Sequence, residues 1–243
     1  MKDLRHRALP AGWYPEREAE IRGVIEGWQN RRAAVATLGD SGIVPHAGWF
    51  YSGELAFSVL SNIRREIETI VVVGGHLPSV DSIKAYTESG VETPLGPIDT
   101  DLELLEAIRE EFSYHPDATP DNTVEVQLPL VKYLFPEARY VGLRVPPTNV
   151  SIMLGEFLAD RSGHDKSLAV VGSTDLTHYG PAYGESNHGS GREAYLWARD
   201  QNDRSFIDAM ISLELPLALS LAAARSAEIH ASRERGCTMN RWD

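Results

Sequence analysis

The stretch Ile70-Val71-Val72-Val73-Gly74-Gly75-His76 decides the fold of this chain. Four β-branched residues in a row, with no polar residue between them, are typical of a strand that is buried on both faces. The glycine pair ends the run, and a histidine follows directly. A strand buried on both faces needs helices on both sides of its sheet, so the stretch indicates an α/β fold.

The segments on either side of this strand alternate between strand and helix patterns. Further strands are predicted over residues 33–38, 43–44, 139–145 and 168–172. Helices are predicted over residues 16–31, 52–60, 101–112 and 123–135, and they dominate from residue 191 to the end. Thr100 is the candidate N-cap of the helix over 101–112. The alternation predicts a single α/β domain over residues 1–243, with a mostly parallel or mixed central sheet flanked by helices.

Composition narrows the class of protein. The chain has 243 residues, a net charge of −12, 42% apolar residues and 24% charged residues, which is ordinary for a globular protein. The acidic balance argues against nucleic acid as the main partner. Cys237 is the one cysteine, so an intramolecular disulfide and a cysteine-based zinc framework are excluded. No apolar run has the length of a signal peptide or a membrane span, and we expect a cytoplasmic protein without membrane contact.

Three histidines follow predicted strands. His46 lies in Pro-His-Ala-Gly-Trp, His76 in Gly-Gly-His-Leu-Pro and His178 in Ser-Thr-Asp-Leu-Thr-His. One such histidine is more often an ordinary hydrogen-bonding residue than a ligand. The carboxyl ends of parallel strands meet at one edge of a sheet, however, and ligands gather there. Three histidines at that edge therefore favour a shared polar site.

Imidazole donors make this a candidate metal site. Neutral imidazole suits zinc, iron, copper or nickel, and two histidines with one carboxylate match the arrangement of non-haem iron oxygenases. The available carboxylates are Asp175, Glu125 and Asp40. Asp175 shares a loop with His178, where it serves either as a ligand or as the group that orients the imidazole.

Other polar and aromatic residues near these loops have two readings each. Glu125 and Gln127 lie on an apolar helix, so they either face the polar site or belong to an ordinary helix start that favours acidic residues. Trp49 and Tyr51 either form the wall of a pocket for a phenolic ligand or belong to the core. The remaining histidines are expected at the surface; they are His6, His115, His164, His188 and His230.

Residues 45–53, Pro-His-Ala-Gly-Trp-Phe-Tyr-Ser-Gly, resemble the PHAGY-x-Y-x-G signature of the Memo family, also called protein B of the AmmeMemoRadiSam system. Five further motifs are similar to those of the family and occur in the same order. They lie at residues 11–15, 74–76, 92–96, 124–129 and 173–179. Together the six motifs place the resemblance over roughly residues 8 to 183.

The resemblance implies a fold similar to that of class III extradiol dioxygenases, which use iron(II). It implies a metal on His46 and His76, with His178, Asp175 and Glu125 in the same pocket. It also implies a link to a radical-SAM system. An animal relative binds phosphotyrosine segments and is tied to copper or iron handling.

The chain departs from the family pattern at several positions. Asn122 stands where the family usually has a histidine, and Gly75 stands where asparagine is common. The C-terminal part matches poorly, and Cys237 has the local context of a helix end rather than of the ligand cysteine. The third ligand is therefore not assigned.

Two functions of different classes follow. The first is a non-haem metal-dependent oxidoreductase of dioxygenase type that acts on a small, phenolic substrate. It has iron(II) as the favoured metal, and zinc or copper as alternatives. In this hypothesis His178, Asp175 and Glu125 are catalytic, and Trp49, Tyr51 and Gln127 bind the substrate. The second is a non-catalytic metal- or ligand-binding accessory protein of a radical-enzyme system; metal-assisted hydrolysis and self-association into a homo-oligomer also stay open. 

Overall fold

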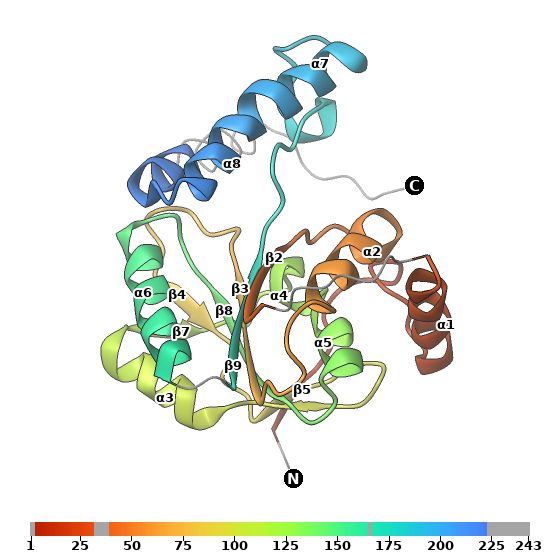
Figure 1. Cartoon of the computed structure of the whole chain (residues 1–243), viewed down its shortest axis with the longest axis vertical. Coiled ribbons are helices and arrows are strands. Elements are labelled where there is room, and N and C mark those ends of the chain that lie inside the picture. The colour runs from red at the N-terminus through yellow and green to blue at the C-terminus, as the bar shows by residue number, and fades with distance from the viewer. Residues whose placement is uncertain (1–2, 32–38, 165–166, 223–243) are drawn as a thin grey trace. The chain divides into compact units, whose positions relative to one another are not determined.

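A computed structural model of the chain describes residues 3–31, 39–164 and 167–222 (Figure 1). The chain divides into two compact units, each described here by itself. The first is formed by Met1–His76, Ser82–Val145 and Leu154–Thr174, and the second by Leu77–Asp81, Pro146–Met153 and Asp175–Asp243. The strand predicted over 33–38 and Cys237 lie outside the described residues. The single domain over 1–243 stays a prediction.

A six-stranded mixed sheet forms the centre of the first unit. Its order is β2 (Ser41–Val44), β9 (Leu168–Ser173), β3 (Thr69–Gly74), β8 (Arg139–Arg144), β4 (Ile83–Ala85) and β7 (Tyr114–Pro116). Neighbouring strands are parallel except for β4 and β8, which are antiparallel. The α/β fold with a mixed central sheet is thereby confirmed. A small second sheet joins β1 (Leu4–Arg5), β5 (Gly90–Val91) and β6 (Ile98–Asp99).

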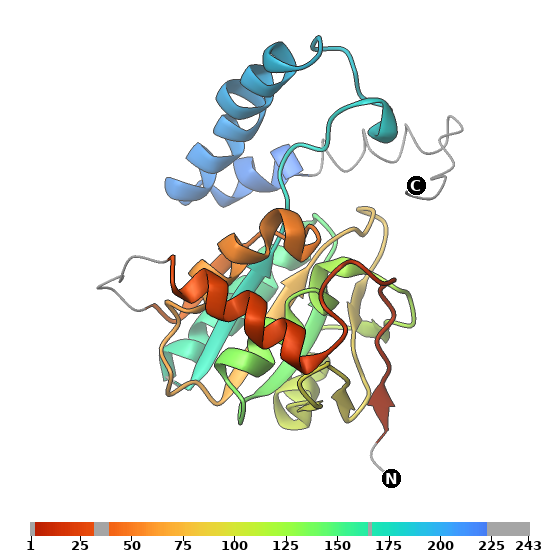
Figure 2. The ribbon, with the colours of Figure 1, turned by 90° about the vertical axis from the view of Figure 1, so that its right-hand side faces the viewer.

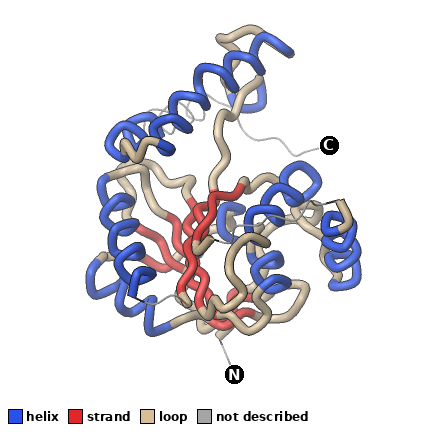
Figure 3. Tube along the Cα trace, in the orientation of Figure 1, coloured by secondary structure: helices blue, strands red, loops and turns tan. Residues whose placement is uncertain are grey.

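Helices cover both faces of the large sheet (Figures 1 and 3). One face carries α1 (Glu18–Gln29), α2 (Trp49–Leu60), α4 (Asn122–Glu125) and α5 (Leu128–Leu134). The other face carries α3 (Leu102–Glu111) and, from Leu154 on, α6 (Asn149–His164). Helix α1 packs beside α2, as Figure 2 also shows. The helix α6 was not predicted from the sequence.

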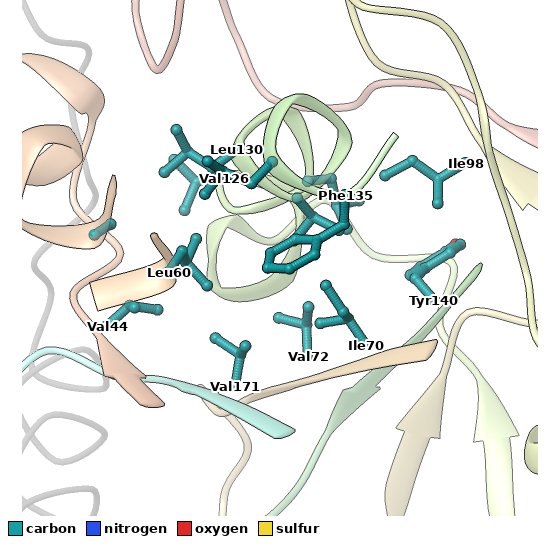
Figure 4. Packing of buried hydrophobic residues seen from close by; sticks show 14 of the residues in the cluster. Val44, Leu60, Ile70, Val72, Ile98, Val126, Leu130, Phe135, Tyr140 and Val171 are labelled. Carbon is teal, nitrogen blue, oxygen red and sulfur yellow. The ribbon is translucent and has the colours of Figure 1, made fainter. Parts of the chain in front are cut away.

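The main core lies between the sheet and the helices α2, α4 and α5 (Figure 4). Ile70 and Val72 of β3 and Val171 of β9 are fully buried in this cluster. Val71 is equally buried but lies outside the cluster, because successive side chains of a strand point to opposite faces. Ile70, Val71 and Val72 are thus buried on both faces of the sheet, as the sequence predicts, and Val73 is half-buried.

One helix cap differs from the prediction. Thr100 is not the N-cap of α3: the cap is Asp101, whose carboxylate accepts a hydrogen bond from the backbone N–H of Leu104 at 3.0 Å. The hydroxyl of Thr100 donates instead to the carbonyl of Glu88. An aspartate carboxylate reaches the free N–H groups of the first turn, so it competes well for the cap position.

The single helix predicted over 123–135 is wrong, because two helices occupy this stretch. Helix α4 ends at Glu125, and α5 begins at Leu128 with Pro129 in its first turn. Proline has no N–H to donate to the carbonyl of Glu125, four residues earlier, so a continuous helix loses a bond at this place. The break turns Val126 and Gln127 into a connector between the two helices.

The second unit is largely helical where it is described. It contains the short helix η1 (Pro181–Tyr183), then α7 (Arg192–Trp197), the π-helical turn η2 (Ala198–Asn202) and α8 (Asp203–Ile211), and residues 215–222 are helical too. Asp203 ties this helical run to the segment before it, because its carboxylate accepts from the backbone N–H of Thr177 at 3.0 Å. None of the helices in the described parts of the chain has the length and apolar character needed to cross a bilayer.

Candidate functional site

The loop that carries His46 connects β2 to α2 and is held by two amide side chains. Gln127 donates one hydrogen bond to the carbonyl of Pro45 at 2.8 Å and another to the hydroxyl of Ser173 at 3.0 Å. Asn122 donates to the carbonyl of His46 at 2.8 Å. His46 is 3% exposed. Both amides thus fix the backbone on either side of a buried histidine.

His76 follows β3 after one residue, Gly75, and lies beside His46. The centroids of the two imidazole rings are 4.8 Å apart, and the rings are nearly perpendicular. The side chain of His76 is 41% exposed, and its backbone is left-handed, with a φ of 58°. Its Nδ1 lies 3.1 Å from a carboxylate oxygen of Asp121. The structure therefore brings together the two histidines that the sequence marks as metal ligands.

Asp121 is the N-cap of α4 and the acceptor for His76. Its carboxylate also accepts from the backbone N–H of Thr123 at 2.9 Å and lies 3.3 Å from a guanidinium nitrogen of Arg144. Burial alone would raise the pKa of Asp121, but the hydrogen bonds from His76 and Thr123 and the charge of Arg144 outweigh it and lower the pKa to about 2. An ionised carboxylate only accepts, so we place a proton on Nδ1 of His76, which leaves Nε2 as the nitrogen for a metal.

Arg144 lies behind the His76 loop at the end of β8. Its side chain is 6% exposed and forms an ion pair with the fully buried carboxylate of Asp117 at 3.2 Å. It also donates to the carbonyls of Gly75 and His76, at 3.0 and 3.1 Å. The two aspartates and the guanidinium of Arg144 form a charged cluster beneath the histidine pair, and the guanidinium of Arg5 joins it through the backbone carbonyl of Asp117.

Sequence reasoning missed Asp121, Asp117 and Arg144, although two of them had a usable signal. Arg144 is at the carboxyl end of a predicted strand, where the same edge rule that selected His46 and His76 applies. Asp121 precedes a helical pattern and is a residue type that caps helices. Asp117 had no comparable signal, since it follows the short edge strand β7, which the sequence did not predict.

Glu125 is buried, and its carboxylate binds residues near the start of the chain. Its two carboxylate oxygens accept from the backbone N–H groups of Ala8 at 2.9 Å and Leu9 at 3.0 Å, and from the hydroxyl of Tyr14 at 2.8 Å. Burial, reinforced by the charge of Glu125, raises the pKa of Tyr14, so the phenol stays a donor. These contacts make Glu125 an anchor for residues 8–14. Its catalytic role stays a prediction.

The two aromatic candidates on α2 have different environments. Trp49 is 5% exposed; its indole N–H donates to the carbonyl of Val126 at 3.0 Å, and its ring lies 5.3 Å from that of Trp28. A side chain on Gly53 would meet Trp28 at 2.7 Å, which explains a glycine within this helix. Tyr51 is 79% exposed. A substrate-binding role for Trp49 and Tyr51 stays a prediction.

Asp175 and His178 belong to the second unit. Nε2 of His178 lies 4.0 Å from a carboxylate oxygen of Asp175. The ring of His178 lies 5.0 Å from that of Tyr183. The distance of 4.0 Å between Asp175 and His178 is longer than a hydrogen bond, so the role of Asp175 as the group that orients His178 stays a prediction. Their membership of the pocket with His46 and His76 stays a prediction.

The third ligand is not found among the residues that the structure describes, because no three His, Cys, Asp or Glu side chains there form a group that could hold a metal ion. Asp40, one of the predicted carboxylates, forms an exposed ion pair with Arg64. The donors that the structure does bring together are the imidazoles of His46 and His76, with the carboxylate of Asp121 behind His76, and metal binding by them stays a prediction.

Comparison with known proteins identifies the family to which the chain belongs. Residues 5–230 match the family model described as Memo-like protein. This chain belongs to the Memo-like protein family. The resemblance seen in the ordered motifs is thereby confirmed.

The relatives are proteins described as MEMO1 family protein. The chain is 32% identical to one from Thermococcus onnurineus over 204 residues, which are 74% of this chain and 67% of that protein. It is 31% identical to one from Caldivirga maquilingensis over 179 residues, covering 70% of this chain and 62% of that protein. It is 27% identical to one from Methanosarcina acetivorans over 228 residues, covering 88% and 77%. The chain thus spans part of the length of each Memo relative.

Proposed function

We propose that this Memo-like protein binds a divalent transition metal through His46 and His76. The observation that carries the proposal is the pair of imidazole rings 4.8 Å apart, one of which is held at Nδ1 by the carboxylate of Asp121. A carboxylate behind a ligating imidazole fixes the tautomer and the orientation of the ring. Iron(II) is the metal we propose first. Zinc and copper are the alternatives, because imidazole suits all three.

The reaction we propose is a dioxygenase-type oxidation of a small, phenolic substrate. The metal, when bound, supplies the redox chemistry. Among the predicted catalytic residues, His178 is the one that would move a proton, with Asp175 as its orienting partner, since an imidazole titrates near neutral pH. Glu125 is the weaker acid-base candidate, because its oxygens already accept three hydrogen bonds from residues 8–14.

The test is metal analysis followed by reconstitution. Protein purified without added metal is analysed for its elements, and it is then loaded anaerobically with iron(II) and assayed for oxygen uptake with catechols. His46→Ala and His76→Ala are expected to lose the metal, whereas His115→Ala, on an exposed position of β7 in the same sheet, is expected to bind it like wild type. Undiminished metal binding by His46→Ala would refute the site.

A second candidate function is that of a metal- or ligand-binding accessory protein in a radical-enzyme system. Asn122 occupies the position where the family usually has a histidine, and its amide donates a hydrogen bond to the carbonyl of His46. The carboxylate of Glu125 likewise accepts a hydrogen bond from the backbone N–H of Ala8. Both side chains thus bind the protein's own backbone. Tight metal binding without oxygen consumption on any catechol would support this function over the oxidoreductase.

A further inference from the structure

Arg144 contacts the His76 loop through two backbone carbonyls, those of Gly75 and of His76 itself. Its Nε donates to the carbonyl of Gly75 at 3.0 Å, and its Nη2 donates to the carbonyl of His76 at 3.1 Å. The guanidinium is itself held from behind by Asp117, at 3.2 Å. A buried arginine that is fixed on one side is therefore a rigid support for the loop on the other.

The loop needs such a support because His76 has an unfavourable backbone conformation. Its φ of 58° is in the left-handed region, which a residue with a Cβ adopts only at a cost. Strained conformations persist where the surrounding structure holds them. Here the two carbonyls that Arg144 binds lie on either side of the strained residue.

Arg144 also acts on the ring of His76. The same carboxylate oxygen of Asp121 lies 3.3 Å from Nη2 of Arg144 and 3.1 Å from Nδ1 of His76. One guanidinium thus fixes the backbone of the histidine directly and the ring through Asp121. A lysine has one ammonium in place of this planar fork and reaches fewer of these acceptors.

We infer that Arg144 is the positioning residue of His76, holding both its left-handed backbone and, through Asp121, the orientation of its imidazole. The inference rests on the proposed function, because a metal is what this orientation serves. It concerns a buried residue that acts through the histidine.

The chain offers a matched control at the other end of the same strand. Arg139 begins β8 as Arg144 ends it, and it also pairs with a helix-capping aspartate, Asp101, at 3.1 Å. It contacts neither the His76 loop nor Asp121. Loss of Arg139 therefore removes an arginine–aspartate pair from β8 without removing the support of His76.

The experiment compares Arg144→Lys, Arg144→Met and Arg139→Met with the wild type. Cobalt(II) is titrated into each protein and followed by its visible absorption. Loss of a group that orients a ligating histidine weakens metal binding by about 10- to 100-fold, and we expect this in both Arg144 variants. Arg139→Met is expected to bind cobalt like the wild type. Unchanged affinity in Arg144→Lys and Arg144→Met would overturn the inference.

A second readout uses no metal. In metal-free protein labelled with ¹⁵N-histidine, NMR reports which ring nitrogen of His76 carries the proton. We expect Nδ1 in the wild type and in Arg139→Met, and a mixture of tautomers in Arg144→Lys. A proton on Nε2 in the wild type overturns the inference even if the Arg144 variants fail to fold.

The two readouts separate this inference from the proposed function. A wild type that takes up no cobalt refutes the metal site, while the NMR comparison still decides whether Arg144 positions His76. A wild type that binds cobalt and an Arg144→Lys variant with unchanged affinity and tautomer refute the positioning role alone.

Discussion

Gly74 is the position where one added methyl group tests the packing behind the candidate site. It ends β3 beneath α4, and a Cβ built on it would lie 2.6 Å from the Cβ of Thr123 and closer still to its hydroxyl oxygen. Thr123 cannot simply rotate away, because its hydroxyl and its backbone N–H both donate hydrogen bonds to the carboxylate of Asp121, the N-cap of α4. Gly74→Ala must therefore push α4 away from β3.

The expected cost follows from overpacking. Extra methyl groups in a packed core lower the free energy of unfolding by about 1 to 3 kcal/mol. The short contact places Gly74→Ala at the upper end of this range, about 3 kcal/mol. For a chain of this length that lowers the melting temperature by about 6 to 12 °C. Gly75→Ala is the control, because a Cβ there meets nothing within 4 Å and its φ is not in the left-handed region. We expect it within about 0.5 kcal/mol of the wild type.

Thermal unfolding followed by circular dichroism measures both variants. Adding Thr123→Ala to Gly74→Ala removes the nearest oxygen, so the double variant should be less destabilised than the sum of the two single ones. The reasoning is refuted if Gly74→Ala melts at the same temperature as Gly75→Ala.

Three further predictions concern buried polar groups. Glu125→Gln is expected to lower the free energy of unfolding by about 2 to 3 kcal/mol, because an amide cannot accept all the hydrogen bonds of the carboxylate; urea titration checks it, and wild-type stability would show that the carboxylate is no anchor. Asp101→Ala is expected to cost about 1 to 2 kcal/mol as a lost helix cap, measured in the same way, and no loss would contradict the cap. Burial raises the pKa values of Tyr14, Tyr86 and Tyr140. Their contribution to stability is therefore complete below about pH 10, the pKa of a phenol in the unfolded chain. It is lost as the pH rises from there toward the pKa of the folded state. In an absorbance titration they should ionise only as the protein unfolds; ionisation near pH 10 with the fold intact would contradict their burial.

The sequence predicted the sheet where its signal was strong and local. The run from Ile70 to Val73 has no polar residue, and a strand buried on both faces follows from that alone. The strand predicted over 168–172 is also confirmed, as β9. The short strands β4 and β7 have three residues each, too few for a periodic pattern, so they could not be predicted in this way.

The candidate site was predictable as a set of residues on sheet-edge loops, but not as a set of contacts. His46 and His76 each lie two residues past the end of a strand, so the edge rule selects them. The support behind them is made by Asp117 and Asp121, which lie in the loop between β7 and α4, and by Arg144 at the end of β8. Which charge meets which depends on how these segments pack, and no local pattern records it.

The position of β9 between β2 and β3 has a consequence for the order in which the molecule is built. The strands that lead to His46 and His76 are not hydrogen-bonded to each other; each pairs with β9, which lies much later in the chain. During synthesis β2 and β3 therefore emerge from the ribosome with open edges, and contacts so distant in sequence form slowly. The part of the sheet that joins the strands before His46 and His76 is complete only after Ser173 has been made, so the frame of the site closes late in synthesis.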